Sequence, residues 1–141
     1  MKSYSTQIQL NHPSSLVFKA ITHELGNWWG PQDNLINAAG DIFKVSWGEP
    51  WYAFEVKEYI KDKYVLWHCI DANQIIDGLE GVQKEWVGTT LHWNLKEISN
   101  NTCELHFLHQ GLVPEFICYD FCSSTWDRFL LHGLKEYLAS Q

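Results

Sequence analysis

The segment that decides the fold is Ser124–Gln141, STWDRFLLHGLKEYLASQ, which follows the strand-like sequence LHFLHQGL of residues 105–112. Its apolar residues recur with the period of one helical face. They are Trp126, Phe129, Leu130, Leu134, Tyr137 and Leu138. A single long helix that follows a run of strands is expected to lie across the sheet and bury its apolar stripe there. The sequence therefore predicts a sheet with a long C-terminal helix on one face, and a cavity between the two.

The rest of the chain alternates short periodic segments with turn residues. Residues 3–10 alternate as a strand does, Pro13 suits the first turn of a helix that runs to about residue 22, and a second short helix is expected over 23–29. Gly, Asn, Asp and Pro then separate six further predicted strands. These span 34–38, 41–47, 52–59, 64–70, 85–98 and 103–109. The expected order is β-α-α-β6-α, an α+β fold in a single domain over residues 1–141.

Alternation along the strands predicts which side chains face the helix. The inward sets are Phe43, Val45 and Trp47; Tyr52, Phe54 and Val56; Val65, Trp67 and Cys69; Leu91, Trp93 and Leu95; and Leu105, Phe107 and His109. A bulge near Gly88 leaves the direction of Trp86 open.

Aromatic residues are the compositional outlier. Eight Trp, seven Phe and six Tyr make up 15% of the chain. Such side chains either fill wide spaces or line apolar pockets. A Trp-lined cavity and a Trp-filled core have the same sequence, so both interpretations stay open.

Charge and cysteine usage exclude several classes of protein. The net charge is −7, and the ten basic residues are scattered, with Arg128 the only Arg, so no phosphate-binding surface is expected. No apolar run reaches membrane-spanning length, and residues 1–10 lack the apolar core of a signal peptide. The four cysteines form no CxxC pair, which favours reduced thiols and a cytoplasmic location.

A set of short motifs runs in order along nearly the whole chain, and it resembles a known superfamily. The motifs are Val17-Phe18-Lys19-Ala20 after Pro13, Trp28-Trp29-Gly30-Pro31, Phe54-Glu55-Val56, Tyr64-Val65-Leu66-Trp67, Gly88-Thr89-Thr90-Leu91, 105–112, and Trp126-Asp127-Arg128-Phe129-Leu130. On these residues the chain is similar to the START-like superfamily, also called SRPBCC or helix-grip. Within it, the chain resembles bacterial homologues of the C-terminal domain of the activator of the ninety-kilodalton heat-shock-protein ATPase.

The resemblance implies a curved antiparallel sheet wrapped around the C-terminal helix. START-like domains bind lipids, sterols, hormones or polyketide intermediates, and a few catalyse cyclisation. The activator adds a link to the stress response and to a protein partner. Since domains of one fold differ in task, the resemblance implies a cavity and leaves its chemistry open.

Histidines are the candidate chemical residues. His68, His92 and His106 are expected on the outer face, where scattered surface histidine is the commoner explanation, so we predict no metal site and no cofactor. His109 points inward at the end of the last strand. It is either a general base or a structural residue bonded to its neighbours. No Ser-His-Asp order and no Gly-rich phosphate loop is present.

Three functions follow from this reading. The first is non-catalytic binding of a small hydrophobic molecule, and the second is a protein-interaction domain with a filled core and an exposed apolar patch near Trp28, Trp51 or Trp86. The third is an aromatase/cyclase-type enzyme that uses His109. The exposed edge strand over 3–10 would suit a homodimer. The ligand-binding candidates are Trp29, Phe43, Trp47, Phe54, Val56, Trp67, Cys69, Trp93, Phe107, His109, Tyr119, Trp126, Phe129 and Leu130.

Overall fold

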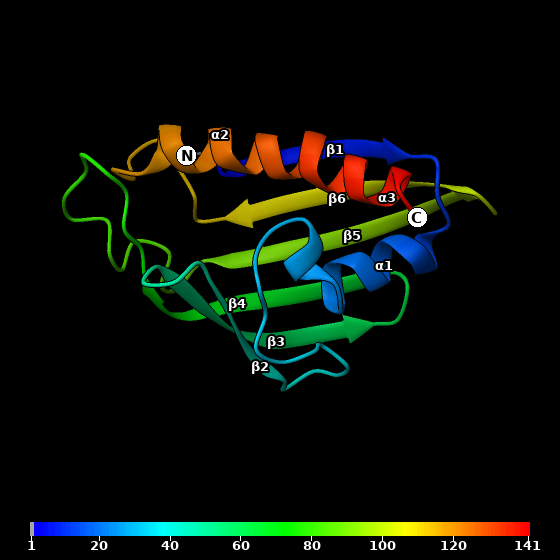
Figure 1. The fold of residues 1–141 in the computed structure, drawn as a ribbon, viewed down its shortest axis with the longest axis horizontal. Coiled ribbons are helices and arrows are strands. Elements are labelled where there is room, and N and C mark those ends of the chain that lie inside the picture. Colours follow the sequence, from blue (N-terminus) through cyan, green and yellow to red (C-terminus); the bar gives the residue numbers. More distant parts are fainter. Residues whose placement is uncertain (1) are drawn as a thin grey trace.

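One antiparallel sheet and one long C-terminal helix organise the chain (Figure 1). The computed structural model describes residues 2–141. The N-terminal part contains β1 (Tyr4–Leu10), helix α1 (Ser14–Thr22) and the 3-10 turn η1 (Leu25–Asn27). The strands β2 (Ile42–Ser46), β3 (Trp51–Ile60), β4 (Tyr64–Asn73), β5 (Thr90–Ser99) and β6 (Thr102–Gln110) follow. The long helix comprises α2 (Tyr119–Arg128), the π-helical turn η2 (Phe129–Leu134) and α3 (Lys135–Ala139). The predicted α+β class and the long C-terminal helix are confirmed.

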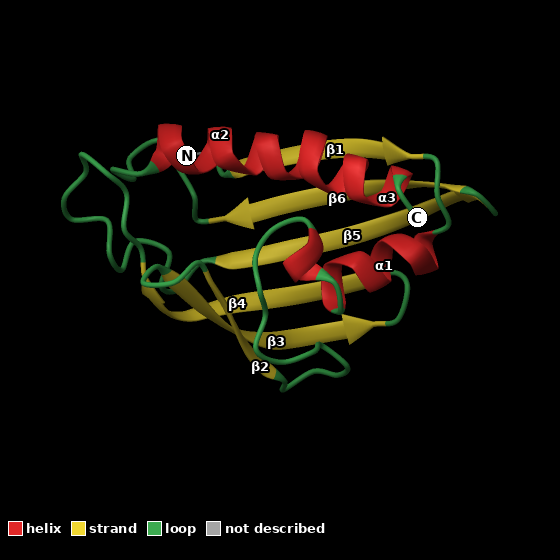
Figure 2. Ribbon diagram, in the orientation of Figure 1, coloured by secondary structure: helices red, strands yellow, loops and turns green. Residues whose placement is uncertain are grey.

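The sheet is continuous from β1 to β2, and its helices share one face. The strand order is β1-β6-β5-β4-β3-β2, so β1 and β2 are the edges. In the register, Trp93 lies opposite Phe107, and Trp67 lies opposite Leu91. Figure 2 shows the C-terminal helix running along β1 and β6 while α1 lies over the middle strands. The inward side chains of β4, β5 and β6 are buried as alternation predicts.

A π-helical turn keeps the C-terminal helix aligned with the sheet. In a regular α-helix, a residue and the one four positions later point in directions that differ by about 40° around the helix axis. A row of side chains with this spacing therefore gradually leaves the face that contacts the sheet. The wider turn η2 compensates for part of this drift. The buried side chains that it keeps in line are Cys118, Cys122, Trp126, Leu130, Leu134 and Leu138.

Aromatic rings fill most of the space between sheet and helix. Trp67, Trp93 and Phe107 are fully buried, and the Trp67 and Trp93 ring centroids lie 4.9 Å apart. Among the described side chains, the indole N–H groups of Trp67 and Trp93 are buried without a hydrogen-bond partner. Such groups cost free energy, so this core gains its stability from apolar packing rather than from polar pairing.

The strand predicted over 34–38 is wrong. Side chains take the hydrogen bonds that a strand partner would have made. The Asp41 carboxylate accepts bonds from the backbone N–H groups of Asn37 and Ala38, at 2.7 and 3.0 Å. The Gln32 amide oxygen accepts from the Leu25 N–H at 2.9 Å, which holds the same loop against η1. Five strands rather than six therefore follow the helices.

Several predicted boundaries also need correction. The second predicted helix is only the 3-10 turn η1. Residues 85–88, predicted as the start of a strand, form turns instead. These turns end at Gly88, whose φ of +92° lies in the left-handed region that glycine favours. The C-terminal helix begins at Tyr119, five residues before the predicted start at Ser124. Trp47 lies just outside the strand, because β2 ends at Ser46, but its ring still faces inward, with its centroid 5.4 Å from that of Trp29.

Candidate functional site

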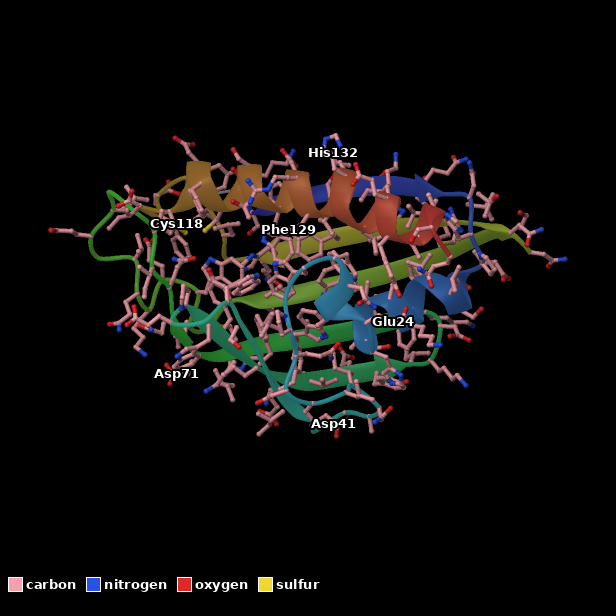
Figure 3. The ribbon with its side chains drawn as sticks, viewed as in Figure 1. Glu24, Asp41, Asp71, Cys118, Phe129 and His132 are labelled. Atoms are coloured by element: carbon pink, nitrogen blue, oxygen red, sulfur yellow. The ribbon has the colours of Figure 1, made fainter. Side chains whose placement is uncertain are left out.

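An apolar cavity of about 210 Å3, open to solvent on one side, lies where α2 and the start of η2 meet the end of the sheet. The loop between β4 and β5 and the turn between β2 and β3 close its other sides. Figure 3 shows Phe129 below the C-terminal helix, toward the sheet, and Cys118 at the start of that helix. The lining residues are Trp29, Trp47, Pro50, Tyr52, Ile75, Ile76, Trp86, Phe121, Cys122, Thr125, Trp126, Arg128 and Phe129.

Stacked rings form the inner wall of this cavity. The Trp86 ring lies between two others, with its centroid 4.0 Å from that of Tyr52 and 5.8 Å from that of Trp126. Both pairs are nearly parallel, at 21° and 19°. Trp29 closes the wall, with its ring centroid 5.0 Å from that of Trp126. Trp86, whose direction the sequence left open, is therefore a buried wall residue.

The polar atoms of the inner wall bond to the protein itself. The Tyr52 hydroxyl donates to Gln74 Oε1 at 2.6 Å, and the Cys122 thiol donates to the same oxygen at 3.3 Å. The Trp86 N–H donates to the Cys122 sulfur at 3.4 Å. Burial also raises the pKa of the Tyr52 hydroxyl, so that it stays protonated. The inner wall therefore presents apolar surface to a ligand.

His109 supports this wall from behind. Its Nδ1 accepts a bond from the Trp126 indole N–H at 3.1 Å, which places the ring proton on Nε2. Nε2–H then donates to Thr89 Oγ1 at 2.9 Å, and that hydroxyl donates to the Trp86 carbonyl at 2.6 Å. Complete burial lowers the pKa of His109 to about 3, because the charged imidazolium would lose its hydration. The neutral ring thus connects two of the tryptophans that line the cavity, Trp86 and Trp126.

Glu85 holds the start of α2 in place. Its two carboxylate oxygens accept bonds from the backbone N–H groups of Ile117 and Cys118, at 2.7 and 3.0 Å. These N–H groups lie at the helix N-terminus, where a negative charge is favourable. The cap comes from a loop more than thirty residues away, so no local capping motif announces it. From the sequence, Glu85 is expected only as the first residue of the strand over 85–98.

The structure brings together four of the predicted ligand-binding residues. Trp29, Trp47, Trp126 and Phe129 line the cavity, and Trp47 is about a third exposed, with its indole N–H bonded to the Trp29 carbonyl at 3.0 Å. Tyr119 is half-buried at the start of α2. The others lie in the packed core outside the lining. They are Phe43, Phe54, Val56, Trp67, Cys69, Trp93, Phe107, His109 and Leu130.

Sequence reasoning missed most of the outer lining. Cys122, Thr125, Trp126 and Phe129 have the spacing of one helical face. Beginning the helix earlier would have found Cys122, whereas Thr125 lay inside the predicted helix and is polar, so the apolar stripe did not include it. Ile75 and Ile76 lie in a loop without periodicity, and no signal in the chain marks them.

The outer face of the sheet carries His68, His92 and His106. His92 bonds through Nδ1 to the Tyr64 hydroxyl at 2.8 Å and through Nε2 to Gln110 Oε1 at 3.0 Å, and His106 pairs with Glu104. Within residues 2–141, no three His, Cys, Asp or Glu side chains come together as a metal site. The adjoining depression of about 1,070 Å3 is larger than the cavity, but it is a shallow, water-exposed part of the surface.

The sequence and the structure were compared with those of known proteins. No protein-family model and no curated relative matches the sequence. Solved structures do match. The Aha1 dimer of Colwellia psychrerythraea is 20% identical, with a TM-score of 0.73 over 93% of this chain and 92% of that one. A Mesorhizobium loti protein is 17% identical, with a TM-score of 0.80 over 99% and 98%. An HSP90 activator of Plasmodium falciparum is 16% identical, with a TM-score of 0.73 over 99% and 97%.

The chain has the START-like helix-grip fold. The resemblance predicted from the sequence motifs is confirmed at this level, including the likeness to Aha1 structures. At these identities the likeness extends to the fold alone. Among the described residues, no helix has both the length and the hydropathy that a membrane crossing requires.

Proposed function

We propose that this protein binds a small, mostly apolar molecule in the cavity between α2 and the end of the sheet, without catalysis. The observation that carries the proposal is a void lined by aromatic rings in an interior that aromatic rings otherwise fill. Ligand sites are typically apolar clefts with few polar groups, and this one has its inner polar atoms already bonded.

The size of the cavity supports a compact ligand. Its volume of about 210 Å3 lies below the range of about 300–1,000 Å3 for pockets that take drug-sized molecules. We therefore expect one or two fused rings or a short chain to bind better than sterols or long fatty acids.

A thermal-shift screen of the purified protein tests the proposal. It should include fatty acids, sterols, flavonoids, aromatic polyketides and small bicyclic aromatics. A ligand that binds only the folded state stabilises it by about 2.7 kcal/mol at one hundred times its dissociation constant. A saturable shift for a compact class supports the proposal, and flat curves for every class contradict it.

A matched pair of variants locates the binding site. Thr125 lines the cavity, whereas its neighbour Ser124 is exposed and does not. Thr125→Phe should fill the space and remove the thermal shift, while Ser124→Phe adds the same ring outside the cavity and should retain it. A shift that survives Thr125→Phe would place the ligand elsewhere.

A protein partner is the second candidate function, favoured by exposed apolar side chains at the cavity mouth. Trp28 and Trp86 are buried, but Ile75 and Phe121 are each about half exposed beside the cavity. Two fold neighbours carry the names Aha1 and HSP90 activator, which supports an HSP90 chaperone as the first partner to test. Stimulation of its ATPase by the purified protein would also support a stress-response role.

A homodimer and an enzyme are the remaining proposals from the sequence. β1 is an edge strand, so a dimer that extends the sheet there stays a prediction for light scattering to test. The cyclase-type alternative is not favoured, because His109 is fully buried and both its ring nitrogens are bonded. Four free, buried cysteines support the reducing cytoplasm as the location.

A further inference from the structure

We infer that the ligand of this cavity is an aromatic carboxylate whose charged group is held at the mouth by Arg128. This inference rests on the proposed function and names the chemical class that the same cavity would take. It depends on where the chain places its only arginine and on what surrounds that side chain.

Arg128 is the last residue of α2 and belongs to the cavity lining. Its guanidinium carbon lies 5.3 Å from the centre of the Phe129 ring, which also lines the cavity. Contact with an aromatic ring restrains a guanidinium while leaving its N–H groups available to acceptors. The side chain is exposed, so the charge lies at the mouth and not in the interior.

The charge of Arg128 is not neutralised by the protein. Within residues 2–141, the basic side chains with a carboxylate inside 4.0 Å are Lys19, Lys57, Lys84 and His106. The adjacent Asp127 accepts a hydrogen bond from the Tyr4 hydroxyl, and neighbours in a helix do not face each other. The lining contains no acidic side chain and no other charged one.

The rest of the cavity defines the body of the ligand. Its inner wall consists of the rings of Trp29, Tyr52, Trp86 and Trp126, and the polar atoms of the last three are bonded to the protein. A flat aromatic body fits this wall, because rings stack well on rings. A charged group on that body finds an oppositely charged partner at the mouth, where Arg128 is the charged residue of the lining.

A carboxylate is the group that gains most there. Arg offers a planar fork of N–H donors that matches two carboxylate oxygens, and such charged hydrogen bonds are stronger than neutral ones. An ammonium group would be repelled, and a neutral amide would gain only ordinary hydrogen bonds. The mouth therefore selects a negative ligand on a protein whose own net charge is −7.

Isothermal titration with 2-naphthoate and 2-naphthamide tests the inference, since the two differ in charge and hardly in shape. We expect the wild-type protein to bind 2-naphthoate about five-fold more tightly at low salt, as a solvent-accessible ion pair allows. Arg128→Gln should abolish this preference, because it should weaken the binding of 2-naphthoate more than that of 2-naphthamide. Lys135→Gln removes an exposed charge from the same long helix outside the cavity lining and should keep the preference.

The outcomes separate the inference from the proposed function. Equal affinities for the two compounds, or a preference that survives Arg128→Gln, would overturn the role of Arg128 while the cavity remains a binding site. Failure of both compounds to bind would overturn the aromatic carboxylate as the ligand class. The wider thermal-shift screen with Thr125→Phe then decides separately whether the cavity binds any ligand.

Discussion

Acid should destabilise this protein through one buried histidine. The pKa of His109 is about 3 in the folded state, against an ordinary value of 6.5, because burial disfavours the imidazolium. The stability that the neutral ring contributes is complete above pH 6.5 and is lost as the pH falls toward 3, since the unfolded chain then binds the proton. At pH 4.5, two units below the ordinary value, this amounts to about 3 kcal/mol of unfolding free energy.

The assay is urea unfolding of wild-type protein and His109→Gln at pH 7.0, 6.0, 5.0 and 4.5. We expect the variant to be less stable at neutral pH, because it removes the imidazole ring, which makes two buried hydrogen bonds in the wild-type protein. This deficit should shrink by about 3 kcal/mol at pH 4.5, since the glutamine does not titrate. His132→Gln, on the exposed face of the C-terminal helix, controls for the loss of a histidine and should follow wild type. A deficit for His109→Gln that is constant across the pH range would refute the reasoning.

Three further changes test the contacts around the site by the same unfolding assay. Trp126→Phe should cost about 1–3 kcal/mol more than Trp93→Phe, because only the first removes a satisfied indole N–H and leaves a buried acceptor without a donor; equal costs would contradict this. Gly133→Ala should destabilise by about 1 kcal/mol although alanine favours helices, since its β-carbon would lie 3.1 Å from the Trp28 carbonyl oxygen; a gain in stability would show that the contact yields. Glu85→Ala should cost about 1 kcal/mol through the lost cap of α2, and an unchanged midpoint would show that the cap is dispensable.

The periodic pattern of apolar residues predicted those parts of the fold in which a regular strand or helix determines which side chains are buried. The inward faces of the later strands followed from alternation, and the long helix followed from its apolar stripe. The segment 34–38 was misread because the Asp41 carboxylate and the Gln32 side-chain amide hydrogen-bond to its backbone from outside any strand. Such side-chain bonds leave no periodic trace in the sequence.

The cavity itself was harder to predict than the residues around it. Whether a tryptophan fills or lines a space depends on its rotamer and its neighbours, and Trp67 and Trp126 look alike in the sequence. One is enclosed by other core rings, while the other has a face on the void. The bonds from Gln74 and Glu85 that shape the site join residues tens of positions apart, so only the folded chain reveals them.

The π-helical turn η2 makes the longest helix tolerant of a change in length. A π turn accommodates about one more residue than an α-helical turn, so removing the exposed Leu131 should let the segment relax to ordinary α-helix. Leu134 and Leu138 would then follow Trp126 at seven and eleven positions, which is the ordinary spacing of one helical face. A chain one residue shorter could thus keep the same buried stripe. Related chains can differ in length at this turn without losing the register between helix and sheet.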